Sequence, residues 1–561
     1  MNSPEVERIW LPHYPPGVAA DIDIHRYASL KDLLEQSCAR FAARPAFTNL
    51  GVSLSYAELE RLSRAFAAYL QQVAGLQKGE RVAIMLPNLL QYPVALFGAL
   101  RAGLVVVNVN PLYTARELQF QLADSGAAAV VVLENFAHTL QQALPGTAVR
   151  QVVTTQLGDL FPPLKRWLVN LAVKRIKRLV PRWEIPAAIS FRQALGQGAH
   201  HVLQAVELGP ADTALLQYTG GTTGVAKGAI LSHGNLVANV EQTSAWIGGV
   251  LKEGAETVVT PLPLYHIFAL TANLLTFVKW GGNNLLITNP RDVAGFLREL
   301  EKTRFTAITG VNTLFDLLLH TSGLERVKQA NGDALKLAVA GGMSVQRGVA
   351  ERWQALMGVP LVEGYGLTEA APIVCANRVD APGFSGDIGL PLPSTQVAIL
   401  AEDGQLLPIG AIGEIAVQGP QVMRGYWNRP DETALAFTPD GWLRTGDLGA
   451  MHPDGSIRFA ERRKDVIVVS GFKAYPNEIE EVALRLPGVR EAAAVGVADR
   501  HSGEAVKLFL VRQDPALDAA AVRAHCRANL AAYKVPKSIE FRDSLPKTPV
   551  GKILRRALKE E

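Results

Sequence analysis

A short segment rich in glycine and threonine has the composition of a phosphate-binding loop. Residues 217–228 (QYTGGTTGVAKG) lie between the strand-like runs ALLQY and AILS. Glycines let the backbone turn its amide groups toward an anion, threonine hydroxyls add donors, and Lys227 adds a positive charge. A Walker A loop needs Ser or Thr after the lysine and then a helix, whereas Gly228 and a strand follow here. We therefore predict a phosphate site of another kind rather than a plain Gly/Thr hairpin.

A second segment, residues 363–370 (EGYGLTEA), follows the strand-like run PLV. Tyr365 stands between glycines, so its ring can offer a flat face to a purine. Thr368 and Glu369 come directly after it, and a carboxylate beside a hydroxyl suits Mg²⁺ that bridges triphosphate oxygens. Taken alone, this motif would more often be a β-turn with a solvated glutamate.

Three single residues could do chemistry only in the company of other groups. His266 lies in the apolar run LPLYHIF, where a histidine is usually part of a core. Asp447 in GWLRTGDLG follows a glycine, as turn residues do. Lys552 in TPVGKILRR stands on a basic tail, where a solvated charge is the ordinary interpretation.

The elements around these motifs predict an α/β fold. Residues 80–132 alternate strand-like runs (RVAIML, LVVVNV, AAAVVVL) with helical segments at 90–101 and 115–125, which indicates βαβ units and a parallel sheet. The same alternation returns over 257–374 (VVTPLPL, NLLIT, FTAITGV, LKLAVAGG, PLVEGYG). We expect two related α/β layers in one large unit.

The sequence pattern changes toward the C-terminus. After Gly383, short β runs with frequent glycine and proline predict a small β-barrel or sandwich. A compact α+β pattern with helices at 476–486 and 518–530 follows. We therefore predict a large domain over 1–461, a hinge at 462–464, and a small mobile domain over 465–561 that carries Lys552.

Composition narrows the possible functions. The 561 residues suffice for three to four structural units at about 150 residues each. Lys plus Arg number 56 and Asp plus Glu 52, and a net charge of only +4 argues against a nucleic-acid binder. Three scattered cysteines indicate neither disulfides nor a zinc site, and no export signal is evident, so we expect a cytoplasmic protein.

Residues 160–183 (LFPPLKRWLVNLAVKRIKRLVPRW) form the most basic segment, with seven basic residues and no acidic one. Leucines and an isoleucine fall on one side of a helix, although Arg175 interrupts that side. The pattern predicts either a helix that lies in an anionic lipid interface, on the inner face of the cell membrane, or a basic helix packed on its own domain. The most apolar run, 93–107, is too short to cross a bilayer.

Five motifs together resemble the acyl-adenylate-forming (AMP-binding) superfamily, and within it bacterial long-chain fatty-acid–CoA ligases. YTGGTTGVAKG, PLPLYHIFAL, EGYGLTEA, GWLRTGDLG and PKTPVGKILRR occur in the family order, and the likeness runs from about residue 47 to 558. One departure is Glu461, where many relatives have glycine before the arginine. The resemblance implies a fatty acid as substrate, ATP and CoA as cosubstrates, and Mg²⁺ as cofactor. It also allows a homodimer.

The resemblance also implies roles for individual residues. Lys552 would bridge the substrate carboxylate and the α-phosphate, His266 would lie near that carboxylate, and Lys464 would serve as the hinge. Glu369 and Thr222 would hold the metal, and both would serve in catalysis. The nucleotide would contact Tyr218, Thr219, Gly220, Gly221, Thr223, Gly224, Lys227, Gly341, Gly342, Glu363, Tyr365, Gly366, Thr368, Asp447 and Arg462.

These roles imply two half-reactions. A carboxylate is a poor electrophile, and conversion to acyl-AMP makes AMP its leaving group before transfer to CoA. A fatty-acyl-AMP ligase that delivers the acyl group to a carrier protein is the alternative within this chemistry. The residues of the acyl pocket are harder to predict. Residues 267–278 and the glycines of GGNN could line a tunnel for the acyl chain, or could equally well belong to a buried core.

Overall fold

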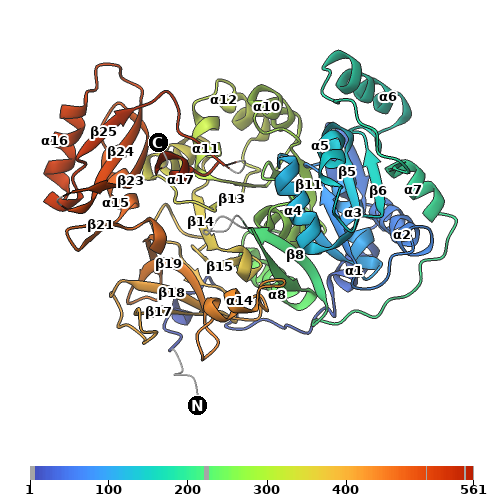
Figure 1. Ribbon diagram of the computed structural model, residues 1–561, viewed down its shortest axis with the longest axis horizontal. Coiled ribbons are helices and arrows are strands. Elements are labelled where there is room, and N and C mark those ends of the chain that lie inside the picture. Colours follow the sequence, from blue (N-terminus) through green and yellow to red (C-terminus); the bar gives the residue numbers. More distant parts are fainter. Residues whose placement is uncertain (1–6, 220–225, 501, 549–550, 560–561) are drawn as a thin grey trace.

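The computed structural model describes residues 7–219, 226–500, 502–548 and 551–559. A large N-terminal region contains two mainly parallel sheets with helices against them, and a smaller region contains the C-terminal sheet (Figure 1). An antiparallel sheet, orange in Figure 1, lies beside them. This arrangement confirms the α/β prediction with a large and a small domain.

The first large sheet has seven strands in the order β7-β6-β5-β3-β4-β8-β9, parallel except for the β8–β9 hairpin. Its strands are β3 (Arg81–Met85), β4 (Val105–Asn108), β5 (Ala127–Leu133), β6 (Gln151–Thr155), β7 (Ile189–Ser190), β8 (Thr213–Thr219) and β9 (Lys227–Ser232). All seven residues of β5 are buried, as expected for a strand covered on both faces. The β8–β9 hairpin frames the predicted phosphate loop.

The second large sheet has nine strands in the order β16-β15-β14-β13-β12-β10-β11-β1-β2. They are β1 (Pro45–Asn49), β2 (Val52–Ser55), β10 (Thr257–Thr260), β11 (Asn283–Leu286), β12 (Ala307–Gly310), β13 (Leu337–Gly341), β14 (Leu361–Gly366), β15 (Ile373–Ala376) and β16 (Leu390–Pro391). The carboxyl ends of the parallel strands β13 and β14 therefore bring Gly341 and Tyr365 to one edge.

Helices pack on and between these sheets. In the large region they are α1 (Leu30–Arg40), α2 (Tyr56–Gln72), α3 (Gln91–Arg101), α4 (Ala115–Ser125), α5 (Ala137–Ala143), α7 (Phe191–Gly198), α8 (His233–Ile247), α9 (Thr276–Lys279), α10 (Val293–Lys302), α11 (Asn312–Leu319), α12 (Leu324–Asn331), α13 (Arg347–Met357) and α14 (Pro430–Ala436). Helix α4 begins with a capping box formed by Thr114 and Glu117 and ends at Gly126 in the left-handed conformation.

The segment predicted as a small barrel is an open four-stranded antiparallel sheet, β17 (Gln396–Leu400), β18 (Gly413–Gln418), β19 (Leu443–Met451) and β20 (Ile457–Arg462). Each outer strand finds another backbone partner, since Leu400 bridges to Leu406 and Ile457 bridges to Gly389. Those partners occupy the edges that would otherwise have to meet to close a barrel.

The small C-terminal region has a mixed sheet with a helical cover. Its strands are β21 (Ile467–Val469), β22 (Phe472–Ala474), β23 (Val489–Asp499), β24 (Gly503–Arg512) and β25 (Ser538–Phe541). Its helices are α15 (Pro476–Leu484), α16 (Ala519–Asn529) and α17 (Arg555–Lys559). Helices α15 and α16 begin within one residue of the predicted positions.

The basic segment is a shorter helix than predicted. Helix α6 (Pro163–Leu171) continues as a π-helical turn over Ala172–Ile176 and stops there, with Arg178 in the left-handed conformation at φ +52°. Pro181 lies shortly beyond, where it could not continue a helix. Helix α6 protrudes from the top of the large region in Figure 1. Within the described residues, no helix has both the length and the apolar character needed to cross a membrane.

Candidate active site

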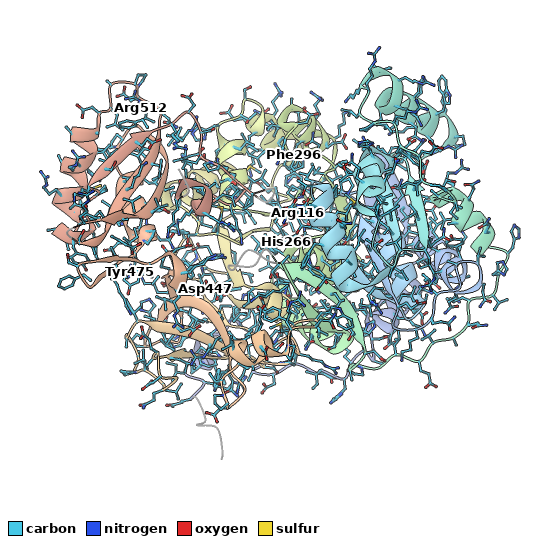
Figure 2. The ribbon with its side chains drawn as sticks, in the orientation of Figure 1. Arg116, His266, Phe296, Asp447, Tyr475 and Arg512 are labelled. Atoms are coloured by element: carbon cyan, nitrogen blue, oxygen red, sulfur yellow. The ribbon has the colours of Figure 1, made fainter. Side chains whose placement is uncertain are left out.

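Residues from the predicted motifs line one cavity of about 1240 Å³ between the two large sheets, the four-stranded sheet and the C-terminal region. His266 and Asp447 lie in this central part of the molecule (Figure 2). The predicted site residues on its wall are Tyr218, Thr219, Lys227, His266, Gly341, Gly342, Tyr365, Gly366, Thr368, Glu369, Asp447, Arg462, Lys464 and Lys552. Glu363 instead lines an adjoining cavity of about 2500 Å³. Gly220, Gly221, Thr222, Thr223 and Gly224 lie outside the described residues.

The β8–β9 hairpin, in which Thr219 pairs with Lys227, leads into and out of the segment predicted to bind phosphate. The ammonium of Lys227 forms an ion pair with Glu432 of α14 and lies 5.4 Å from the ring centre of Tyr426. The Tyr218 hydroxyl donates a hydrogen bond of 2.6 Å to Asp124 of α4. Tyr218 thus anchors the hairpin to its neighbouring helix, and Lys227 is the charged group that the hairpin offers to an anion.

Tyr365, Asp447 and Arg462 form a polar cluster that joins β14 to the four-stranded sheet. The Tyr365 hydroxyl donates a 2.7 Å hydrogen bond to Asp447, and the Arg462 guanidinium lies 3.7 Å from the other oxygen of that carboxylate. Asp447 and Arg462 are directly paired across β19 and β20. Burial raises the pKa of Asp447, while the charge of Arg462 and the tyrosine hydrogen bond act in the opposite direction.

The Gly341–Gly342 pair ends β13 where the backbone comes close to other groups. Gly342 has φ +78°, and a Cβ there would lie 3.4 Å from Cε of Lys552. A Cβ on Gly341 would lie 3.1 Å from the carbonyl oxygen of Gly364. Glycine at 342 therefore fits both the left-handed backbone and the close approach of the lysine.

Lys552 enters the cavity from the C-terminal region on a short turn. The backbone N–H of Lys552 donates to Oγ1 of Thr548, and the N–H of Thr548 donates to the carbonyl of Lys552. The Thr313 hydroxyl of α11 donates a 3.3 Å hydrogen bond to the carbonyl of Gly551. Burial and, to a smaller extent, the charge of Arg462 lower the pKa of Lys552 to about 8, and Asp447 opposes this shift.

His266 is neutral at physiological pH. Burial lowers its pKa to about 4, with a further contribution from the nearby charge of Lys552. Its Nδ1 accepts a 3.3 Å hydrogen bond from the backbone N–H of Phe268, which assigns the ring proton to Nε2. The side chain can therefore donate one hydrogen bond to a negatively charged group.

Glu369 has the chemistry of a magnesium ligand. One of its carboxylate oxygens accepts a 2.8 Å hydrogen bond from the Tyr426 hydroxyl. Mg²⁺ is usually held by one or two carboxylates together with substrate phosphates. Among the described residues no cluster of three or more metal-binding side chains occurs, so this single carboxylate fits a phosphate-bound magnesium ion rather than an all-protein site.

The other end of the cavity is apolar. Its wall includes Trp246 and Ile247 from α8, Phe277 from α9, and Leu337, Val339 and Val362 from β13 and β14. Ile267, Phe268 and Ala272 also line it, whereas the GGNN glycines 281 and 282 face Phe41 and Phe277 instead. Sequence reasoning missed the contribution of α8. Thirteen of its 15 residues are buried in the structure, but polar residues such as Asn239 and Gln242 are among them, so the sequence shows no continuous apolar signal there.

Lys464 lies in a 3-10 turn, Arg463–Asp465, that connects β20 to β21. Its side chain lines both cavities, and burial lowers its pKa. This connection is where the chain passes from the four-stranded sheet to the C-terminal sheet. A hinge here stays a prediction.

The cavity is lined by Lys227, Lys552 and Asp447 and also by a group of apolar side chains. In a chain with a large and a small domain, this lining is typical of an enzyme that acts with a nucleotide. The chain belongs to the AMP-binding enzyme family, whose model matches residues 34–427, and the model of the AMP-binding enzyme C-terminal domain matches residues 478–552.

Similar proteins support this membership. A long-chain-fatty-acid–CoA ligase of Escherichia coli O6:H1 is 56% identical over 99% of this chain and 98% of the relative, and one of Haemophilus influenzae is 50% identical over 99% of both. Among solved structures, ATP-bound MatB from Rhodopseudomonas palustris has a TM-score of 0.77 and 28% identity, covering 94% of this chain and 98% of its own. A benzoate CoA ligase from Burkholderia xenovorans LB400 has a TM-score of 0.80 and 26% identity, with 95% and 99% coverage.

Proposed function

We propose that this protein is a long-chain fatty acyl-CoA synthetase of the AMP-forming type. The observation that carries the proposal is one cavity that is lined both by Lys552, Asp447 and Tyr365 and by a group of apolar side chains. The polar part suits a nucleotide, and the apolar part suits a hydrocarbon chain. The names of the relatives, long-chain-fatty-acid–CoA ligases, agree with this division.

In the first half-reaction, a fatty carboxylate oxygen attacks the α-phosphorus of ATP, and pyrophosphate leaves. His266 donates its Nε2 proton in a hydrogen bond to the carboxylate, and the Lys552 ammonium stabilises charge between carboxylate and α-phosphate. Lys227, with Thr222 and Thr223, holds the departing pyrophosphate. When bound, Mg²⁺ supplies positive charge to the phosphate oxygens, and Glu369 with Thr222 would hold it.

Two further groups place the nucleotide. Asp447 can accept hydrogen bonds from both ribose hydroxyls, because its carboxylate has acceptor capacity beyond the single Tyr365 bond. Gly341, Gly342 and the Tyr365 ring offer flat surfaces for the base. Glu363 lies in the strand that leads to Tyr365, and its buried Oε2 has no hydrogen-bond partner among the residues that the structure describes. Burial raises the pKa of Glu363 to about 8, so the carboxyl is mostly protonated at neutral pH and its Oε2 can donate a hydrogen bond to a ring nitrogen of adenine.

In the second half-reaction, the CoA thiolate attacks the acyl carbonyl carbon, and AMP leaves with the bonding electrons. We propose that the small domain rotates about Lys464 between the two steps, which withdraws Lys552 and admits CoA. No protein nucleophile is needed. The three cysteines, Cys38, Cys375 and Cys526, are all buried, and burial raises the pKa of each thiol.

Pyrophosphate exchange across a series of carboxylates tests this proposal. Exchange between labelled pyrophosphate and ATP should require a fatty acid and should increase with chain length toward long chains. Addition of CoA should then yield acyl-CoA and AMP in equal amounts. Exchange without CoA-dependent turnover would favour a fatty-acyl-AMP ligase that serves a carrier protein, and absence of exchange with every lipid acid would refute both.

We also propose that α6 and the following turn bind an anionic membrane surface from the cytoplasmic side. Six large apolar side chains of this segment are exposed: Leu164, Trp167, Leu168, Leu171, Ile176 and Leu179. The segment is attached to its domain through other residues, since Asn170 accepts a bond from Gly158 and Lys174 pairs with Glu134 at 2.6 Å. Apolar and basic groups thus share a protruding surface, as in interfacial helices.

Vesicle sedimentation measures this contact. Vesicles of phosphatidylcholine with phosphatidylglycerol should bind the protein, and vesicles of phosphatidylcholine alone should bind it less. The double variant Trp167→Ser and Ile176→Ser should lose most binding, whereas Val202→Ser, at an even more exposed apolar residue outside this segment, should not. Equal binding by all forms would contradict the proposal. A homodimer stays a prediction that sedimentation velocity can measure.

A further inference from the structure

Glu461 is a buried carboxylate next to the predicted hinge, and the three hydrogen bonds that it accepts come from Arg462 in the hinge and from Arg555 and Asn477 beyond it. Its side chain is 1% exposed at the end of β20. Oε1 accepts 2.9 Å hydrogen bonds from the backbone N–H of Arg462 and from the guanidinium of Arg555. Oε2 accepts a 2.8 Å bond from the backbone N–H of Asn477, in the first turn of α15.

Arg555 uses all parts of its guanidinium in this contact. Nη1 donates to Glu461, Nη2 to the side chain of Asn477 at 2.6 Å, and Nε and Nη2 to the two oxygens of Glu480 at 3.1 and 2.8 Å. Asp465 lies 3.7 Å away. Since Glu480 and Asn477 belong to α15, the arginine ties the small domain together and also ties it to the last strand of the large domain.

The same arginine is three residues from Lys552. The turn between them is held by a bridge between Lys547 and Ile553 and by a 2.8 Å hydrogen bond from the N–H of Leu554 to the carbonyl of Pro546. A displacement of Arg555 relative to Glu461 would therefore carry Lys552 with it. The position of the lysine over Gly342 depends on where this arginine is anchored.

We propose that the Glu461–Arg555 pair is a positioning device that holds Lys552 in the nucleotide cavity for the adenylation step. The inference rests on the proposed function and adds a contact that controls which of the two half-reactions the protein can perform. Glu461 lies before the predicted hinge and Arg555 after it, so their contact must break when the small domain turns. The Arg555–Glu480 pair lies within the small domain and persists. The device therefore favours one domain orientation over the other.

Glu461→Gln removes the negative charge with which Arg555 pairs across the hinge, while Arg555 keeps its ion pair with Glu480. Pyrophosphate exchange should fall about tenfold, the usual scale of coupling between two conformations. Thioester formation from supplied acyl-AMP and CoA should be unchanged or faster, and KM for ATP should change little. Arg555→Lys, which keeps the charge but loses the forked geometry, should show the same split.

Glu481→Gln is the matched control. It makes the same chemical change in α15, in an ion pair with Arg485 whose side chains are 58% and 63% exposed. Both half-reactions of this variant should equal those of the unaltered protein. Tryptic cleavage after Lys464 gives a readout that does not depend on activity, and it should be faster in Glu461→Gln than in Glu481→Gln.

The outcomes separate the two proposals. Equal losses in both half-reactions would show a merely structural role for the pair, and unchanged exchange would show no role in positioning Lys552. Either result overturns this inference while the proposed function stands. Absence of fatty-acid-dependent exchange in the unaltered protein would refute the proposed function itself, and this inference with it.

Discussion

The adenylation step should lose activity at alkaline pH because Lys552 must be protonated. Burial lowers the pKa of Lys552 to about 8, and Arg462 adds to this shift. With that pKa the protonated fraction is about 0.9 at pH 7 and about 0.1 at pH 9. If only the ammonium form stabilises the developing charge, the rate of adenylation should fall about tenfold over this range.

The two half-reactions provide the assay and its internal reference. Pyrophosphate exchange at ATP and fatty-acid concentrations well below saturation, measured from pH 6.5 to 9.5, should show the alkaline loss, because the rate in this regime reports the pKa of the protein without bound substrate. Thioester formation from supplied acyl-AMP and CoA should not, because Lys552 is withdrawn in that step. Lys552→Ala should lower exchange by about 10² to 10³ at pH 7, the scale for removal of one preorganised charge-stabilising donor.

Lys552→Arg separates this explanation from others. A guanidinium stays protonated throughout this pH range, so the variant should be slower at pH 7 but should lack the loss between pH 7 and 9. An alkaline loss of equal size in Lys552→Arg would mean that another group titrates. A flat profile in the unaltered protein would refute the assignment of a lowered pKa to the reacting form of Lys552.

Three further changes have outcomes that the structure specifies. Gly342→Ala should slow adenylation severalfold and leave thioester formation intact, because φ is +78° and the new Cβ would lie 3.4 Å from Lys552; exchange rates would measure this. Leu337→Phe should narrow the apolar part of the cavity, so the fatty acids with the highest kcat/KM should be of medium rather than long chain length. If kcat/KM across a series of chain lengths is unchanged, the acyl chain binds elsewhere. Burial raises the pKa of Glu363 to about 8, so the folded protein binds more protons than the unfolded one between pH 4.5 and 8, and stability falls as pH rises there. Glu363→Gln should reduce the fall in the free energy of unfolding over this range by up to about 1.4 kcal/mol per pH unit. The melting temperature of the variant should therefore depend less on pH.

Local periodicity was sufficient for most elements. Helix α4 occupies the predicted range 115–125, and β5 coincides with the apolar run AAAVVVL. Helix α4 buries one face, so its buried residues recur at helical spacing, whereas β5 is buried on both faces and reads as one continuous apolar run. Both patterns can be recognised in a sequence. The order of strands within each sheet was not predictable in this way, because pairing such as β1 with β11 joins segments far apart in the chain.

The site was predictable in composition but not in geometry. The motifs named Tyr365 and Asp447, yet nothing in their 82-residue separation indicates that one hydroxyl donates to the other carboxylate. Glu432, the partner of Lys227, belongs to no motif that suggested it. Glu461 stood out only as a departure from the family pattern, and its role as the buried acceptor for Arg555 depends on a contact between residues 94 positions apart.

The placement of Lys552 explains why a movable group suits this reaction. In the cavity, burial and Arg462 both disfavour the ammonium, and only Asp447 favours it. A fatty carboxylate and an α-phosphate would add the missing negative charge, so the protonated lysine and the two substrates stabilise one another. Once pyrophosphate has left and the carboxylate is esterified, part of that negative charge is gone, and the ammonium is again disfavoured where it lies. Departure of the lysine to solvent would relieve this cost, so we infer that the electrostatics of adenylation themselves favour the turn toward the thioester step.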